Sequence, residues 1–347
     1  MIFVRLIALI CYVLLLCLCA LLLDADWFCV GLTLAPIALF MAPLFAASAA
    51  GNFYWSEGST SATLTVNAPT SLTDLTTGTS TTFTSGTTDC MCYDRYNDLL
   101  WQASGTSVVC RSTNPASGTT THSFTAPQSV VAIDCDPTNS RVFYITKNGS
   151  SFDLRKINYD GTGSTSLITW SGNFTNAEID VRYDLTLDRV YYIKALTSAS
   201  STTELRYISP SGSGDTLVAS KSDPFGGYGR IHSIAIDVTN RYLFWVESTN
   251  VFSANLQRST MSGGSVTTIA SSLGSGTYKL TFSQLQSKVY VWMGNGGLGS
   301  GDVVRYMNTD GTSNTSLGIP TGSTTGTKSA WFALGTGFET IGVSAIL

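Results

Sequence analysis

The sequence predicts an all-β protein: a six-bladed β-propeller of four-stranded antiparallel blades, closed by a C-terminal strand and preceded by an apolar N-terminal leader. Three observations support this prediction. A strand–turn–strand pattern recurs along the chain, its copies are spaced by 43–53 residues, and the first copy lacks its opening strand. Repeats of about 40–50 residues that contain four strands each are typical of propellers.

The clearest copy spans residues 234–269. An alternating apolar strand ends at Asp237, a polar turn follows, and a second strand carries the aromatic pair Phe244 and Trp245. A third strand near 255–261, a glycine turn and a short fourth strand complete the unit. A sheet of this size cannot bury both faces alone, so it must stack on copies of itself.

The other copies repeat this order of elements. The second aromatic residue of each pair forms one column, with steps of 46, 43, 48, 53 and 46 residues: Trp55, Trp101, Tyr144, Tyr192, Trp245 and, as the exception, Val291. Six copies fill residues 51–347, and we expect the column to pack between blades.

The two ends of the propeller are expected to share one blade. The first copy opens directly on 53–57 with no strand before it, and the apolar segment 329–335 has no aromatic-pair strand after it. We expect 329–335 to be the inner strand of the blade that begins at Phe53, because this arrangement leaves no open seam. The apolar tail 341–347 either packs on the rim or is a strand donated to a neighbouring molecule.

Several of these units resemble the YWTD (class B) repeats of the low-density-lipoprotein receptor family. The nearest matches to the name-giving tetrad are 54–57, Tyr-Trp-Ser-Glu, and 244–247, Phe-Trp-Val-Glu. Residues 133–137 and 158–162 resemble the strand-end aspartate and the Asp-Gly turn of that family. The resemblance implies a six-bladed propeller that acts as an extracellular interaction module.

Residues 1–50 form a separate segment. Positions 2–23 are apolar apart from Arg5, and 27–50 are again apolar and end in small residues that offer a signal-peptidase site at Ala47-x-Ala49. We favour a cleaved signal peptide. An uncleaved signal anchor, whose orientation Arg5 fits, and a two-helix hairpin are the alternatives. The first two place the propeller, residues 51–347, outside the cell, secreted or at the cell surface.

The N-glycosylation sequons and the cysteines also favour a location outside the cell. Three acceptors for N-glycosylation occur, Asn148, Asn173 and Asn314. Outside the leader there are four cysteines, Cys90, Cys92, Cys110 and Cys135, all within two neighbouring copies. An even, clustered count predicts one or two disulfides. A bridge from Cys90 to Cys92 would be strained, which leaves two complete pairings open, and buried free thiols are the alternative.

The surface is expected to be polar but weakly charged. Charged residues make up 12% of the chain, against a usual value of about 25%. Without Arg5, Asp24 and Asp26, 18 basic and 21 acidic residues remain, a net charge of −3. Weak charge permits dense self-association. The scattered Lys and Arg residues argue against nucleic acid as a partner.

The sequence offers no convincing catalytic, metal-binding or cofactor-binding set. Only two histidines exist, and we expect both His122 and His232 to be structural, although His232 lies near the mouth of the ring. The cysteine spacing is not a zinc pattern, and phosphate loops and nucleophile elbows are absent. We therefore expect no cofactor and no catalytic activity.

Acidic residues recur at the end of the inner strands, at Asp94, Asp136, Asp184 and Asp237, and Ser283 takes this place in the next copy. We expect each to accept hydrogen bonds from the following turn. A ring of carboxylates that binds a cation such as calcium is the alternative.

Three classes of function are compatible with these observations. The favoured one is a structural subunit of a surface or filamentous assembly, which binds protein and self-associates. A receptor-like ligand-binding module and a propeller lyase or hydrolase are the alternatives. The best partner-contact candidates are Phe225, Tyr228 and Arg230, because they combine aromatic anchors with an arginine in one loop.

Overall fold

The computed structural model describes residues between 53 and 334, and for strands before residue 88 and after residue 317 only the backbone course is described. The chain divides into two units, 1–49 and 50–347, and every described residue belongs to the second. The gaps in the description are 57–63, 69–78, 85–87, 114–118, 173–178, 197–201, 223–229, 251–252, 275, 285, 295–302 and 318–330. The leader and the tail 341–347 therefore lie outside the described residues. Within the part that is described, no helix is long and apolar enough to cross a membrane.

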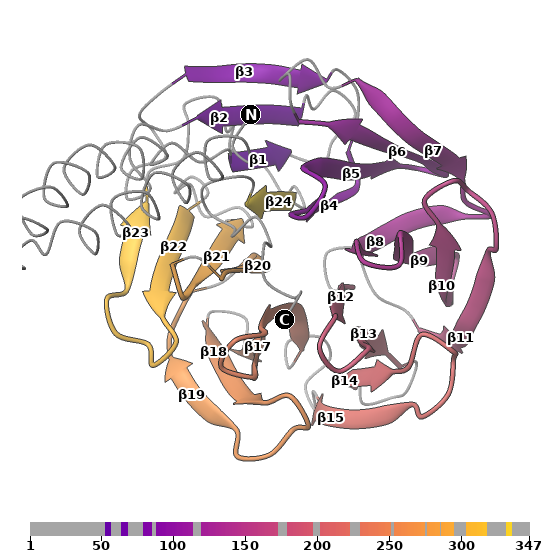
Figure 1. The fold of residues 1–347 in the computed structure, drawn as a ribbon. Helices are drawn as coiled ribbons and strands as arrows, with labels where there is room; N and C mark the ends of the chain where they lie inside the picture. The colour runs from indigo at the N-terminus through magenta and orange to yellow at the C-terminus, as the bar shows by residue number, and fades with distance from the viewer. Residues whose placement is uncertain are drawn as a thin grey trace, which may run out of the picture. The chain divides into compact units, whose positions relative to one another are not determined.

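Five blades each consist of four consecutive antiparallel strands (Figure 1). The first blade comprises β4 (Cys90–Asp94), β5 (Leu99–Ser104), β6 (Ser107–Ser112) and β7 (Thr120–Thr125). The second comprises β8 (Ser129–Asp136), β9 (Arg141–Asn148), β10 (Ser151–Asn158) and β11 (Thr165–Ser171). The third comprises β12 (Val181–Asp184), β13 (Arg189–Ala195), β14 (Thr203–Ile208) and β15 (Thr216–Lys221). The fourth comprises β16 (Ile231–Asp237), β17 (Tyr242–Asn250), β18 (Ser253–Thr260) and β19 (Thr267–Ala270). The fifth comprises β20 (Thr277–Ser283), β21 (Lys288–Gly294), β22 (Val303–Asn308) and β23 (Thr315–Leu317).

A further four-stranded sheet, here called the closing sheet, combines strands from both ends of the propeller. Its order is β24 (Trp331–Leu334), β1 (Phe53–Ser56), β2 (Leu64–Ala68) and β3 (Thr79–Thr84). β24 pairs antiparallel with β1, with Phe53 opposite Leu334 and Ser56 opposite Trp331. The expectation that 329–335 supplies the inner strand beside Phe53 is therefore confirmed.

The inner strands form a continuous ring around a channel. β4 contacts β8, β8 contacts β12, β12 contacts β16 and β16 contacts β20, while β24 contacts both β20 and β4 (Figure 1). The structure is thus a propeller of four-stranded antiparallel sheets, but it differs from the predicted ring of six blades. It has five blades of consecutive strands, and the closing sheet fills the remaining place.

Burial follows the position of a strand within its blade. The inner strand β16 is buried along its whole length, whereas the outermost strand β7 alternates between exposed and half-buried residues. Inner and second strands are apolar because they pack between blades on both faces. Outermost strands are rich in Ser and Thr because they meet water.

The aspartates at the ends of the inner strands are buried and bind the turns that follow. Asp94 accepts the backbone N–H groups of Tyr96 and Asn97 at 3.0 and 3.1 Å. The equivalent bonds join Asn139 to Asp136, Thr186 to Asp184, and Thr239 and Asn240 to Asp237. In the fifth blade the hydroxyl of Ser283 accepts the N–H of Gln286. The structural role predicted for this position is confirmed.

The aromatic column departs from the predicted alignment in one blade. Tyr144, Tyr192, Trp245 and Val291 each lie opposite the residue three places before the strand-end Asp or Ser. Trp101 lies opposite Cys92, which is only two places before Asp94. Because side chains alternate along a strand, Trp101 is equivalent to Phe143 and faces the other side of its blade.

Neighbouring blades meet through glycine turns. The turn after the third strand of a blade carries a glycine with positive φ, and the outermost strand of the preceding blade lies against it: Gly161, Gly212, Gly263 and Gly311. A Cβ on Gly263 would lie 2.8 Å from the carbonyl oxygen of Val218, and one on Gly311 would overlap the carbonyl of Ile269. Val218 and Ile269 are the extra residues of β-bulges in β15 and β19, since the register skips them.

The glycine contact gives a stability prediction. Gly311→Ala should lower the free energy of unfolding by about 1–2 kcal/mol for the left-handed backbone and by a further ~1–3 kcal/mol for overpacking against Ile269. Gly214→Ala is the matched control, because Gly214 also has positive φ but nothing lies within 4 Å of its Cβ position. Urea unfolding of the two variants and the parent measures the difference. Equal losses would show that the blade contact contributes nothing.

The closing sheet gives a second prediction. Ending the chain after Leu317 removes β24, which exposes the edge of β1 and opens the ring between β20 and β4. The truncated protein should melt at a lower temperature and associate through the open edge. Calorimetry and light scattering check this, and a truncated chain that stays monomeric and as heat-stable as the parent would contradict ring closure by β24.

Candidate site in the central channel

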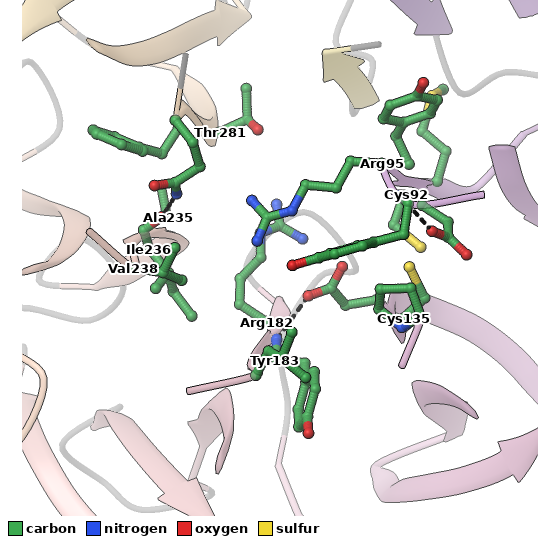
Figure 2. A pocket seen from close by; sticks show the side chains of 18 residues that line it. Cys92, Arg95, Cys135, Arg182, Tyr183, Ala235, Ile236, Val238 and Thr281 are labelled. Carbon is green, nitrogen blue, oxygen red and sulfur yellow. Dashed lines mark hydrogen bonds between the residues drawn. The ribbon is translucent and has the colours of Figure 1, made fainter. Parts of the chain in front are cut away.

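A pocket of about 140 Å³ lies where the inner strands converge (Figure 2). Each of the five blades contributes the residue that lies two places before its strand-end Asp or Ser. These equivalent residues are Cys92, Asp134, Arg182, Ala235 and Thr281. The ring of inner strands thus brings together side chains that are far apart in sequence. The reactive and charged members, Cys92, Asp134 and Arg182, come from three successive blades, so the wall they form is polar.

Cys92, Asp134 and Cys135 form a tight cluster on this wall. One sulfur or oxygen atom of each lies within 4.8 Å of the others. Figure 2 shows the sulfur atoms of Cys92 and Cys135 facing each other where β4 adjoins β8. Both cysteines are buried, while Asp134 is half-buried and accepts the backbone N–H of Tyr183 at 2.7 Å.

Arg182 connects three blades at the centre of the channel. Its guanidinium donates to the carbonyl oxygens of Val181, Ile234 and Leu280 at 3.0–3.1 Å. It also forms a 3.1 Å ion pair with Asp180, a fully buried carboxylate. Asp180 in turn accepts hydrogen bonds from the hydroxyl of Ser233 and the N–H of Ile234. These bonds to β16 and β20 join three successive blades and hold Arg182 in place.

Burial and neighbouring charges set the protonation states of the wall. Burial raises the pKa of Asp134 to about 6, although the positive charge of Arg182 and the bond from Tyr183 oppose this shift. Burial likewise raises the pKa of Cys92 to about 11. The hydrogen bond that the Cys135 thiol donates to Cys92 raises the pKa of Cys135, and burial adds to the effect. Burial lowers the pKa of Arg182, but the carboxylates of Asp180 and Asp134 outweigh burial and leave it raised. Both thiols are therefore protonated and Arg182 is charged at neutral pH.

The predicted disulfides are not formed in the structure. Cys90, Cys92, Cys110 and Cys135 are all buried free thiols. The reason is the sheet: Trp101 of β5 pairs with Cys92 on one side and with Cys110 on the other. Strands two apart are separated by about 9–10 Å, whereas disulfide Cα atoms lie about 4.4–6.8 Å apart. Both complete pairings left open by the sequence join Cys110 to Cys90 or Cys92 of β4, so neither fits.

The two histidines do not take part in the pocket. His232 is buried in β16, where its Nε2 contacts the hydroxyl of Ser248 and its ring meets Tyr278 edge-on. His122 lies on the outermost strand β7 and stacks on Trp101. The structural role expected for both residues agrees with these contacts.

The other predicted site residues are only partly described. Phe225 and Tyr228 lie outside the described residues, while Arg230 is half-buried at the start of β16 and its carbonyl accepts the N–H of Ser248. Asn148 is exposed in the β9–β10 hairpin, and Asn314 is exposed before β23. Asn173 is outside the described range. Glycosylation and partner contact at these positions stay predictions.

Spacing of the cysteines within one stretch of chain does not reveal the channel cluster. A zinc pattern within one stretch of chain is absent, yet Cys92 and Asp134 occupy the same position in successive copies. Alignment of the copies on their strand-end aspartates places these residues, with Arg182, side by side around the channel. That alignment was available from the sequence.

The burial of His232 predicts a pH dependence. Burial, with Arg230 and Lys279 nearby, lowers its pKa from 6.5 to about 3. Between these values the unfolded chain binds more protons than the folded one, so stability contributed by neutral His232 is lost as pH falls from about 6.5 to 3. We expect the stability of the His232→Gln variant to fall less steeply than that of the parent as the pH decreases. Urea midpoints from pH 7 to 4 measure this, and parallel curves throughout that range would contradict it.

Comparison with known proteins supports the fold and does not assign a family. No protein-family model matches the chain, and no curated protein matches it. The YWTD resemblance therefore rests on the repeat residues alone.

Solved structures show similar architecture at low sequence identity. The nidogen/laminin complex contains a chain 11% identical, with a TM-score of 0.60, and the match covers 82% of this chain and 98% of that chain. TolB from Acinetobacter baumannii is 9% identical, with a TM-score of 0.61, over 82% of this chain and 67% of that chain. Hydrazine synthase from Kuenenia stuttgartiensis is 9% identical, with a TM-score of 0.50, over 74% of this chain and 75% of that chain. At these identities the similarity shows a β-propeller fold and nothing finer.

Proposed function

We propose that this chain is a non-catalytic, extracellular protein-interaction propeller, and that it serves as a structural subunit of a surface or filamentous assembly. The proposal is supported by the perimeter of the ring, where strand edges are unpaired and charged residues are few. The outermost strands β7, β11, β15 and β19 each have one edge without a strand partner in their own blade. Among their residues the only Lys, Arg, Asp or Glu is Lys221.

Open edges of this kind favour association. Proteins that remain monomeric usually place charged side chains on edge strands, because free backbone N–H and C=O groups can pair with another chain. Here Lys221 is paired with Glu247 at 2.7 Å and contributes little free charge. Two large apolar side chains near the perimeter, Leu217 and Val266, are 46% and 52% exposed. Bulges interrupt the edges of β15 and β19 at Val218 and Ile269, where the glycine turn of the next blade lies against the strand.

Receptor-like ligand binding is the second candidate. The similar chain in the nidogen/laminin complex belongs to an assembly of two different proteins. A related use of this propeller would also be extracellular and non-catalytic, but its partner would be another protein.

Lyase or hydrolase activity has less support in the described channel. Asp94 is engaged by the turn that follows it, and Asp134 already accepts a backbone N–H. Of the described residues that line the pocket, none is a histidine. That leaves Asp134, with a pKa of about 6, as the one candidate general base among the described lining residues.

The experiment compares lysines placed on the perimeter with a lysine placed on a face of the ring. Thr169→Lys with Leu217→Lys places two lysines on β11 and β15, whereas Thr138→Lys places one in the exposed turn between β8 and β9. We expect the parent and Thr138→Lys to form large species in light scattering and negative-stain images. The double variant should shift to propeller-sized particles.

Two outcomes would contradict the proposal. A parent protein that is monomeric at every concentration would contradict self-assembly. Receptor-like binding would then be the remaining candidate function, and a pull-down from the cell surface would test it. Dissociation by Thr138→Lys, with no effect of the double variant, would place the interface on a face of the ring instead of its perimeter.

A further inference from the structure

We propose that Cys92, Asp134 and Cys135 form a binding site for one thiophilic divalent cation of the Zn²⁺ class at the wall of the central channel. The proposal stands on the ligand atoms themselves, which lie within 4.8 Å of one another and come from two adjacent inner strands. In a tetrahedral zinc site, with Zn–S near 2.3 Å and Zn–O near 2.0 Å, neighbouring ligand atoms lie about 3.3–3.8 Å apart. Small side-chain movements would therefore close the three atoms around an ion.

The chemistry of the ligands selects the class of metal. Two sulfur donors favour Zn²⁺, Co²⁺ or Cd²⁺ over Mg²⁺ and Ca²⁺, which prefer sites made only of oxygen. The site differs from the carboxylate ring considered in the sequence analysis. Those strand-end aspartates are buried and already bound to their turns.

The surrounding charge suits such an ion. Two thiolates and one carboxylate carry three negative charges, so a bound divalent cation leaves one negative charge. Arg182 lines the same pocket and supplies a positive charge that is held in place by three backbone carbonyls. The backbone N–H of Tyr183 fixes the orientation of the Asp134 carboxylate, as outer contacts do in metal sites.

The pocket leaves a place for a fourth ligand. Its volume of about 140 Å³ exceeds the space that one water molecule needs, and Cys92, Asp134 and Cys135 all line it. Three protein ligands with an open fourth position resemble the arrangement of an exchangeable zinc site more than that of a closed structural one. The fourth ligand would be water or a small anion that enters through the channel.

Metal binding to the purified full chain tests the proposal. The chain is stripped with a chelator under reducing conditions, titrated with Zn²⁺, and separately titrated with Co²⁺ to detect sulfur-to-cobalt charge transfer. We expect one Zn²⁺ per chain, release of thiol protons on binding, and loss of roughly tenfold or more in affinity for Cys92→Ser, Cys135→Ser and Asp134→Asn.

Cys110→Ser is the matched control. Cys110 is an equally buried free thiol, but it lies on β6 outside the three-residue cluster. The Cys110→Ser variant should bind Zn²⁺ and Co²⁺ as the parent does. Circular dichroism verifies that every variant is folded.

Three results would overturn the proposal. The first is no binding of Zn²⁺ to the folded, reduced chain. The second is equal binding by the parent and all three ligand variants, which indicates an adventitious ion only. The third is a Cys92–Cys135 disulfide, found by mass spectrometry of the chain as isolated, that persists under mild reduction and excludes metal.

Discussion

The contact on which the ring depends is the packing of a glycine turn against a bulged strand of the preceding blade. At Gly263 and Gly311 the turn approaches so closely that a single methyl group would meet a backbone carbonyl. Both residues also have positive φ, which only glycine adopts without cost. At these two junctions the distance between blades is therefore set by backbone against backbone. Side chains can vary widely at the perimeter because they do not determine this spacing.

Fixed spacing between blades determines what reaches the channel. Each inner strand ends in a buried Asp or Ser that closes its own turn, so the strand stops at the same depth in every blade. The position two residues earlier is then free to differ, and it holds Cys, Asp, Arg, Ala and Thr in successive blades. The structural acids and the channel residues belong to one strand but have separate roles. Asp136 is satisfied by Asn139 and Arg141, whereas Asp134 is half-buried and faces the pocket.

The sequence predicted the parts of the structure that recur. Strand order, the Asp-capped turns and closure by β24 follow from a repeated pattern, because each copy supplies the same physical solution to burial of its sheet. The features that differ between copies were harder to predict from the sequence. Trp101 was aligned with Tyr144 although its register matches Phe143, since the count from Asp94 is shorter by one residue. The two complete disulfide pairings do not fit because strand β5 separates Cys110 from β4, which proximity in sequence does not reveal. The channel cluster emerges only when the copies are aligned on their strand-end aspartates, because composition and spacing within one stretch of chain do not bring Cys92 and Asp134 together.

The perimeter and the channel differ in chemistry, so the two proposals concern different kinds of binding partner. The perimeter has open backbone edges, few charges and no deeply buried polar groups on β7, β15 and β19, so it suits contact with large protein surfaces. The channel wall has two thiols, a carboxylate and a fixed guanidinium in a space far too small for a protein segment, so it suits an ion or a small anion. The second strand of each blade, whose central residues are buried, lies between these regions. Because a densely packed layer of this kind resists deformation, association at the perimeter can leave the channel geometry unchanged, and each region can be altered without disturbing the other.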